Sequence, residues 1–338
     1  MLIKCPHCKA TLNEKRDVCP YCKAYIKDEM EKISEVKAEP VYSTAFFIKE
    51  AIMSAFKPEP IENLPSNMAY QRRPSKSLSK YLVIGAAMIV LGCFLLFGDL
   101  WFQYIGVTMN CFMLPIVFLI WFLQNDRYEP EPISFVAYLF GWGAIAGLGS
   151  YVLNPLLYPY LGAAGGAIVE EPLKLVGIYL FAKGKLFRTE INSHLDGMIY
   201  GAAIGAGFTS LENMLYIFNG IGGNVALAML ERMTTAFMHI AWTAIAARTL
   251  GLALSLRGNM KVTDLIPGLI VVVPLHFLWN SVPEIMRGTV ILPITLLVLF
   301  REVNMAVKDE ESWGFKLVAP SEKNVRRRYK YTRTRRGT

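Results

Sequence analysis

Long apolar runs alternate with short polar stretches through most of the chain, and several runs approach or exceed the roughly 20 residues that a membrane-spanning helix needs. The alternating segments of about 10 residues that mark a transmembrane β-barrel are not seen. We therefore predict an all-α polytopic membrane protein with about eight transmembrane helices. The predicted spans are residues 81–98, 105–123, 133–153, 161–182, 194–219, 225–254, 264–282 and 285–304.

The loops between these spans differ in charge. Positive residues follow the fourth span at Lys183, Lys185 and Arg188 and the sixth at Arg257 and Lys261, whereas the intervening loops carry almost no charge. Basic loops tend to stay in the cytoplasm. This pattern predicts a cell-membrane protein with a transmembrane domain at residues 81–305 and both termini in the cytoplasm.

The composition supports a membrane protein, with 54% hydrophobic residues and a mean hydropathy of +0.35. The net charge of +8 is concentrated at the two ends of the chain. In the C-terminal tail, residues 306–338, the run RRRYKYTRTRR at 326–336 is typical of a basic segment held near anionic lipid. We do not expect a nucleic-acid partner.

Four cysteines near the N-terminus form two CxxC pairs, Cys5 with Cys8 and Cys19 with Cys22, separated by ten residues. This spacing predicts a cytosolic zinc ribbon at residues 1–26, in which four thiolates hold one structural Zn²⁺. A pair of disulfides is the alternative. Such a ribbon is expected to bind a cytosolic protein.

Residues 27–80 form a predicted linker with several prolines. Within it, residues 41–56 place apolar side chains at helical spacing. They predict an amphipathic helix that lies on the membrane or docks a partner, or else a simple connecting helix.

Small residues recur four apart, as in Gly143 and Gly147, Gly162 and Gly166, and Gly197, Gly201 and Gly205. This spacing is typical of closely packed membrane helices. We expect a tight helix bundle.

Several spans contain polar residues whose burial in lipid would be costly, so they are expected to converge on a protein-lined cavity. Glu170 and Glu171 lie with Lys174 in the fourth span, and further polar residues lie in the next three. At a rise of about 1.5 Å per residue, Glu170, Glu212 and His276 lie roughly 13, 10 and 9 Å from the outer ends of their spans. The polar residues in the later spans are Asp196, Glu212, Asn213, Arg232, His239, His276 and Asn280.

These residues stand in segments that resemble the PrsW intramembrane proteases. The segments are EEPLK from Glu170, DGMIYGAAIGAGFTSLEN from Asp196, the stretch from Arg232 to His239, HFLWN from His276, and DRYEPEP from Asp126. The resemblance covers roughly residues 100–285 and implies a protease that cuts a single-span membrane protein, such as an anti-sigma factor. A related group, the CAAX prenyl proteases, shares the HxxxN pattern of His276 and Asn280 but has histidine where Glu212 stands.

Two mechanisms fit this set of residues. In the first, Glu170 activates water, with Glu171 and Lys174 orienting it. His276 and Asn280 stabilise the oxyanion, and Glu212 with His239 completes the site. In the second, Glu212, His239 and His276 hold a catalytic divalent metal ion and Glu170 is the base. The prolines at 172 and 274 are expected to bend their helices beside the site and admit water.

Structural roles are expected for two further residues. Arg232 is expected to pair with an acid, and Asp196 to cap its helix. Two other functions remain open at this point. Buried acids and histidines also occur in ion- or proton-coupled transporters, and the ribbon would suit a non-catalytic receptor or scaffold.

Overall fold

The computed structural model describes residues 3–4, 11–12, 78–126, 131–183, 191, 193–219, 224–257 and 260–318. The four ribbon cysteines, the possible amphipathic helix at 41–56 and the basic tail at 326–336 lie outside these ranges. Near the N-terminus, β1 (Ile3–Lys4) and β2 (Thr11–Leu12) pair antiparallel, with Ile3 opposite Leu12. Residues 75–126 and 130–307 form one compact unit, which is described below.

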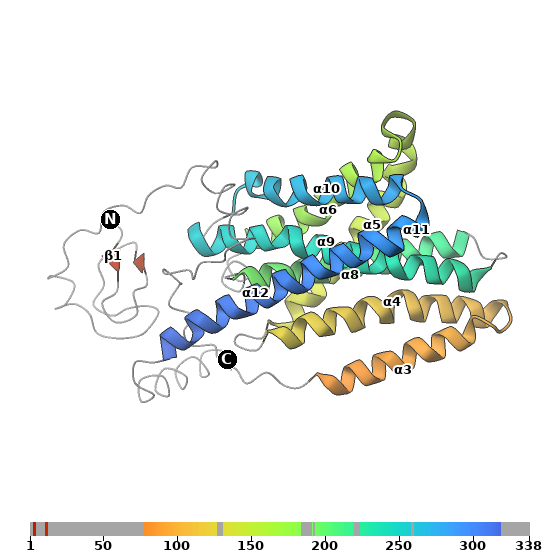
Figure 1. Cartoon of the computed structure of the whole chain (residues 1–338), viewed down its shortest axis with the longest axis horizontal. Coiled ribbons are helices and arrows are strands. Elements are labelled where there is room, and N and C mark those ends of the chain that lie inside the picture. The colour runs from red at the N-terminus through yellow and green to blue at the C-terminus, as the bar shows by residue number, and fades with distance from the viewer. Residues whose placement is uncertain are drawn as a thin grey trace. The chain divides into compact units, whose positions relative to one another are not determined.

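This unit is helical in the part that the structure describes, and a helix lies at each position where a span was predicted (Figure 1). The last predicted span begins as a short helix and a π-helical turn, Arg287–Ile291, before its long helix. The helices are α3 (Ser79–Leu95), α4 (Leu100–Asn125), α5 (Ile133–Leu161), α6 (Ala164–Ala182), α8 (His194–Asn219), α9 (Val225–Arg257), α10 (Leu265–Ser281), α11 (Glu284–Met286) and α12 (Leu292–Val318).

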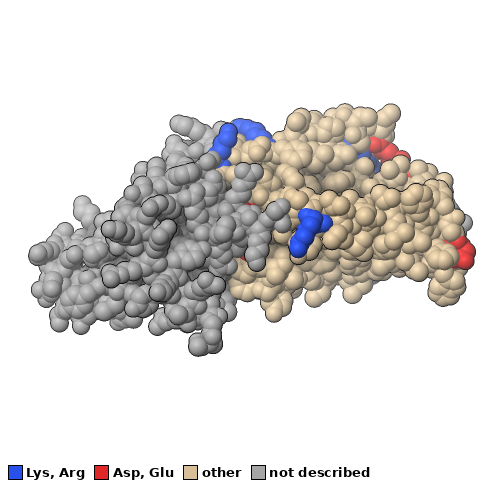
Figure 2. All heavy atoms as spheres, turned by 90° about the horizontal axis from the view of Figure 1, so that it is seen from below, with Lys and Arg blue, Asp and Glu red and all other residues tan. Residues whose placement is uncertain are grey.

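Among the described helices, five segments are long and apolar enough to cross a membrane: Leu100–Asn125, Ile133–Leu161, Val225–Leu254, Val262–Ser281 and Glu284–Lys308. α3 is apolar but shorter, with 17 residues. α6 and α8 are not among the five, and both carry ionisable side chains along their length. The face seen in Figure 2 shows few charged side chains outside the grey region. This is an integral membrane protein.

Several helix ends follow from local sequence. Asp99 caps α4 by accepting hydrogen bonds from the backbone N–H groups of Trp101 (3.2 Å) and Phe102 (3.3 Å). Asp196 in turn accepts from the Ser193 backbone N–H at 2.9 Å and from its hydroxyl at 2.8 Å, while the Ser193 hydroxyl accepts from the Asp196 N–H. This reciprocal arrangement at the start of α8 confirms the predicted capping role of Asp196.

α8 forms the centre of the bundle, buried on nearly every face and packed against α5 and α9. Its glycines permit this close packing, since a Cβ on Gly205 would come within 2.7 Å of the His239 carbonyl oxygen on α9. The expected small-residue packing is confirmed here. The expectation of close packing is wrong for Gly162, because its Cβ position faces open space. Gly162 instead ends α5 with a φ of 56°, a conformation that glycine adopts without strain.

Candidate active site

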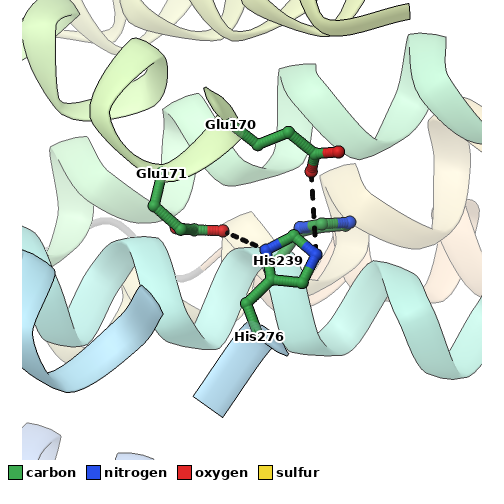
Figure 3. A group of neighbouring side chains, drawn as sticks. All are labelled: Glu170, Glu171, His239 and His276. Carbon is green, nitrogen blue, oxygen red and sulfur yellow. Dashed lines mark hydrogen bonds and ion pairs between the residues drawn. The ribbon is translucent and has the colours of Figure 1, made fainter. Parts of the chain in front are cut away.

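Four ionisable side chains from three helices meet inside the bundle (Figure 3). Glu170 and Glu171 come from α6, His239 from α9 and His276 from α10. Each is buried, and one ligand atom from each lies within 4.8 Å of those of the others. Convergence of acids and imidazoles from separate spans is the arrangement expected of a functional centre in a membrane protein.

The hydrogen bonds fix how the two imidazoles are oriented. Lys174 Nζ lies 2.8 Å from His239 Nδ1, and an ammonium can only donate, so this nitrogen accepts. The opposite nitrogen, Nε2, therefore carries the proton and lies 3.1 Å from Glu212 Oε2, in ion-pair contact. In the same way His276 Nδ1 donates to the Glu171 carboxylate at 2.8 Å, so in the neutral ring the lone pair lies on Nε2.

Each imidazole thus has its own carboxylate partner, Glu212 for His239 and Glu171 for His276. Such pairs are typical of histidines that bind metal or exchange protons, because the carboxylate holds the ring and its tautomer in place. Glu212 was predicted as a metal ligand. The structure places it behind His239, on the far ring nitrogen and outside the four-residue group.

Lys174 is buried at the centre of these contacts. Its ammonium lies 2.8 Å from Glu171 Oε1 and 3.9 Å from Glu170 Oε2. It also stands 4.0 Å from the centre of the Phe208 ring, a distance that gives a cation–π interaction. The positive charge offsets the repulsion between two adjacent carboxylates in a medium of low dielectric constant.

Arg232 pairs with an acid, as predicted. Its guanidinium lies 2.9 Å from Glu212 Oε2, and its Nε donates to the Asn213 side-chain oxygen at 2.7 Å. The Arg232 side chain is 22% exposed and stacks on the Tyr216 ring. The ion pairs therefore extend from the buried His239, through Glu212, to a partly exposed arginine.

The two oxygens of the Glu170 carboxylate have different surroundings. Oε1 accepts a hydrogen bond of 2.7 Å from the Asn154 side chain of α5, a residue that sequence reasoning did not identify. Oε2 is buried and has no hydrogen-bond partner among the described residues. It faces His276 Nε2 at 3.8 Å. Glu170 Oε2 and His276 Nε2 thus face each other without a hydrogen bond between them.

Asn280 lies one helical turn beyond His276 and is exposed. Within the described ranges, its side-chain nitrogen makes one long contact, of 3.5 Å, with the Ala163 carbonyl oxygen. A Cβ on Gly166 would approach this nitrogen to 3.4 Å and Glu170 Oε1 to 3.3 Å. Asn280 therefore stands beside the four-residue group, near Glu170, without joining it.

Aromatic rings and continuous helices enclose the group. The Trp242 ring lies 5.2 Å from the His276 ring and 6.3 Å from the His239 ring. α6 and α10 continue through Pro172 and Pro274, each of which removes a backbone N–H donor. The site is thus polar in its centre and apolar around it.

The donor set suits a divalent cation. Two imidazole nitrogens, His276 Nε2 and the His239 Nδ1 that accepts from Lys174, stand beside two carboxylates, and catalytic zinc sites use two histidines with one glutamate. The Glu170 oxygen that lacks a hydrogen bond is a further donor. Lys174 Nζ is the cation that contacts this set in the structure.

Together, fold and site define a polytopic helical membrane protein with a buried carboxylate–imidazole centre of a kind used in hydrolysis. The chain matches the family described as "PrsW family intramembrane metalloprotease" over residues 131–303, a region that contains all three helices that supply the four side chains of the site. The chain belongs to this family of intramembrane proteases.

Curated relatives agree with this assignment. Protease PrsW of Geobacillus kaustophilus is 31% identical over 37% of this chain and 58% of its own length. Protease PrsW of Clostridioides difficile is 26% identical over 59% of this chain and 90% of its own length. Protease PrsW of Bacillus subtilis is 26% identical over 48% and 75%. No solved structure matches the chain.

Proposed function

We propose that the protein hydrolyses a peptide bond of a single-span membrane protein at the centre formed by Glu170, Glu171, His239 and His276. The observation that carries this proposal is the Glu170 oxygen Oε2, which is buried, makes no hydrogen bond among the described residues and faces the lone pair of His276 Nε2. A water molecule that contacts both atoms can give a proton to the Glu170 carboxylate.

In this mechanism Glu170 is the general base that takes a proton from the attacking water. Glu171 fixes the His276 ring through Nδ1, and Lys174 keeps Glu171 ionised by its contact of 2.8 Å. Glu212 holds His239 in the matching tautomer. After attack, the proton on Glu170 passes to the departing amine of the substrate.

Charge that develops on the carbonyl oxygen needs a donor nearby. We assign this role to the Asn280 side chain, which lies one turn from His276, is exposed, and makes only a long contact. His239 and His276, with Glu170 or Glu171, would hold a divalent cation. A bound cation would acidify the attacking water and polarise the scissile carbonyl.

For the topology, we propose that all eight helical segments at the predicted spans cross the membrane, with both termini in the cytoplasm. α6 and α8 then cross with their charged residues turned toward the bundle. In this orientation the site lies in the outer half of the bilayer and acts on the extracytoplasmic or membrane-embedded part of its substrate. An anti-sigma factor is a substrate of this kind.

The terminal segments have separate proposed roles. The four N-terminal cysteines form a structural zinc ribbon that binds a cytosolic protein, and the basic tail contacts anionic lipid. Deletion of residues 1–40 is expected to leave catalysis intact, and this can be checked by the cleavage rate of the truncated protein.

A purified, liposome-reconstituted preparation tests the proposed function. The probe is a panel of single-span membrane proteins with a different fluorescent tag at each end, hereafter the reporter panel. Wild type is expected to separate the tags of at least one reporter, and Glu170→Gln to separate none. A wild-type protein that cleaves no reporter, or a Glu170→Gln variant that still cleaves, contradicts the proposal and favours transport or a scaffolding role.

A further inference from the structure

Asn154 lies on α5, in contact with the acid that we propose as the base. Its side-chain nitrogen donates to Glu170 Oε1 at 2.7 Å, close to the short limit for N–H···O bonds and typical of a charged acceptor. Because the carboxylate accepts, the amide nitrogen must face Glu170. The orientation of the carboxamide is therefore set, and Oδ1 points away from the acid.

Asn154 Oδ1 is buried and has no hydrogen-bond partner within the part of the chain that the structure describes. A buried carbonyl oxygen without a donor is unfavourable, so buried acceptors of this kind are nearly always paired. A peptide substrate supplies the missing group, because every non-proline residue carries a backbone N–H.

The surroundings of Asn154 suit an approaching peptide backbone. Gly166 lies opposite on α6, and a Cβ there would stand 3.9 Å from the Asn154 side-chain nitrogen and 3.4 Å from that of Asn280. Two carboxamides from different helices therefore flank a residue that has no side chain. A peptide that reached these side chains would meet both amides and the Glu170 carboxylate.

We propose that Asn154 has two roles in proteolysis, which rest on the proposed function above. Its amide nitrogen positions Glu170, and its Oδ1 accepts a hydrogen bond from a backbone N–H of the substrate. Substrate recognition at this point depends on the peptide backbone and not on a particular side chain.

Kinetics on the most rapidly cleaved member of the reporter panel test both roles in full-length, reconstituted protein. Asn154→Ala removes donor and acceptor together. Asn154→Asp keeps an acceptor and replaces the donor with a carboxyl group that donates only when protonated. The matched control is Ser150→Ala, one turn earlier on α5, because among the described residues the Ser150 hydroxyl bonds to the Gly147 carbonyl oxygen of its own helix, at 2.9 Å.

Asn154→Ala is expected to lower kcat by about 10- to 100-fold, as loss of a group that orients an active-site ligand does, and to raise KM about three- to tenfold through the lost backbone contact. Asn154→Asp is expected to keep a KM near wild type. Its rate relative to wild type is expected to be highest at acid pH and to fall as pH rises, because the introduced carboxyl must be protonated to donate to Glu170. Ser150→Ala is expected to match wild type in both constants.

Other outcomes overturn the proposal. If both Asn154 variants lose activity only in proportion to the folded fraction, with KM and pH profile unchanged, the residue is merely structural. If Asn154→Asp has the pH profile of wild type, the positioning role is wrong, and if Asn154→Ala has the KM of wild type, the backbone contact is wrong. A wild type that cleaves no reporter contradicts the proposed function itself, and this inference with it.

Discussion

Two groups of buried charges in the bundle differ in a way that separates function from packing. One is the active-site group, in which Glu170, Glu171, His239 and His276 converge. The other contains an ion pair, in which Arg248 Nε of α9 lies 3.0 Å from Glu302 Oε2 of α12, with both side chains at most 6% exposed. Burial of charge is common to both.

The groups differ in what their atoms face. Arg248 and Glu302 join one cation to one anion across a helix contact, and such pairs hold helices in register. The active-site group brings two acids and two imidazoles from three helices together, and Glu170 Oε2 faces His276 Nε2 at 3.8 Å. A buried charge is therefore a weak indicator of function, whereas convergence of several titratable groups of different kinds is a strong one.

The largest expected effect follows loss of one imidazole. His276→Ala removes a predicted cation ligand and the ring that faces Glu170, so cleavage is expected to fall by at least about 10³-fold. Metal analysis of the full chain is expected to show about one equivalent less than wild type, because catalytic sites lose their ion when a ligand is removed.

His194 supplies the control for this measurement, since it is buried at the start of α8 and lies outside the group. His194→Gln is expected to keep the metal content of wild type. Equal metal content in wild type and His276→Ala would favour the metal-free glutamate mechanism.

A smaller effect is expected behind His239. Glu212→Gln removes the carboxylate that lies against His239 Nε2 and pairs with Arg232, and loss of such a partner costs about 10- to 100-fold in activity. The rate at which Glu212→Gln cleaves the reporter panel measures this loss of activity. Glu231→Gln, at an exposed position on α9, is the control and should equal wild type. An unchanged rate in Glu212→Gln would remove this residue from the site.

A still smaller effect is expected at Gly166. Alanine is favoured over glycine in a helix by about 0.5–1 kcal/mol, so Gly166→Ala should fold at least as well as wild type. Its methyl group would stand 3.3 Å from Glu170 Oε1, and the resulting shift of a few tenths of an ångström is expected to slow cleavage roughly three- to tenfold.

Gly165→Ala is the matched control, because a Cβ at the adjacent position meets Leu161 Cβ at an ordinary 3.5 Å. It should have the helix preference of Gly166→Ala without the loss of rate. Equal rates in the two variants would show that the space at Gly166 has no part in catalysis.

The smallest effect on catalysis is expected at the ion pair on α9 and α12. Glu302→Gln leaves Arg248 without this carboxylate, and breaking a buried pair costs about 3 kcal/mol. The thermal midpoint in detergent should therefore fall, while the cleavage rate of each folded molecule stays near that of wild type. A loss of rate without a loss of stability would assign Glu302 to the site.

The positions of the helices follow from sequence because each apolar run is long and its ends carry polar or capping residues. Convergence was also predictable, since equal depth in separate spans brought Glu170, Glu212 and His276 to one level. The sequence does not show how each helix is rotated about its own axis. Without this information, Glu212 was expected inside the group, whereas the structure turns it to the far side of His239.

Asn154 was missed for a different reason. The predicted span ended at residue 153, and a residue before proline is disfavoured in a helix, yet α5 continues through Pro155 and Pro159 to Leu161. The extra turns bring Asn154 to Glu170. Tertiary packing of α5 against α6 and α8 outweighs the local preference and adds a residue to the site.

One experiment tests most directly whether the converged group performs proteolysis while the Arg248–Glu302 pair supports the fold. Cleavage of the reporter panel is measured side by side for wild type, Glu170→Gln and Glu302→Gln, each corrected for its folded fraction. We predict no detectable fragment from Glu170→Gln and a rate near wild type from Glu302→Gln. Fragments from Glu170→Gln, or equal loss in both variants, would contradict it.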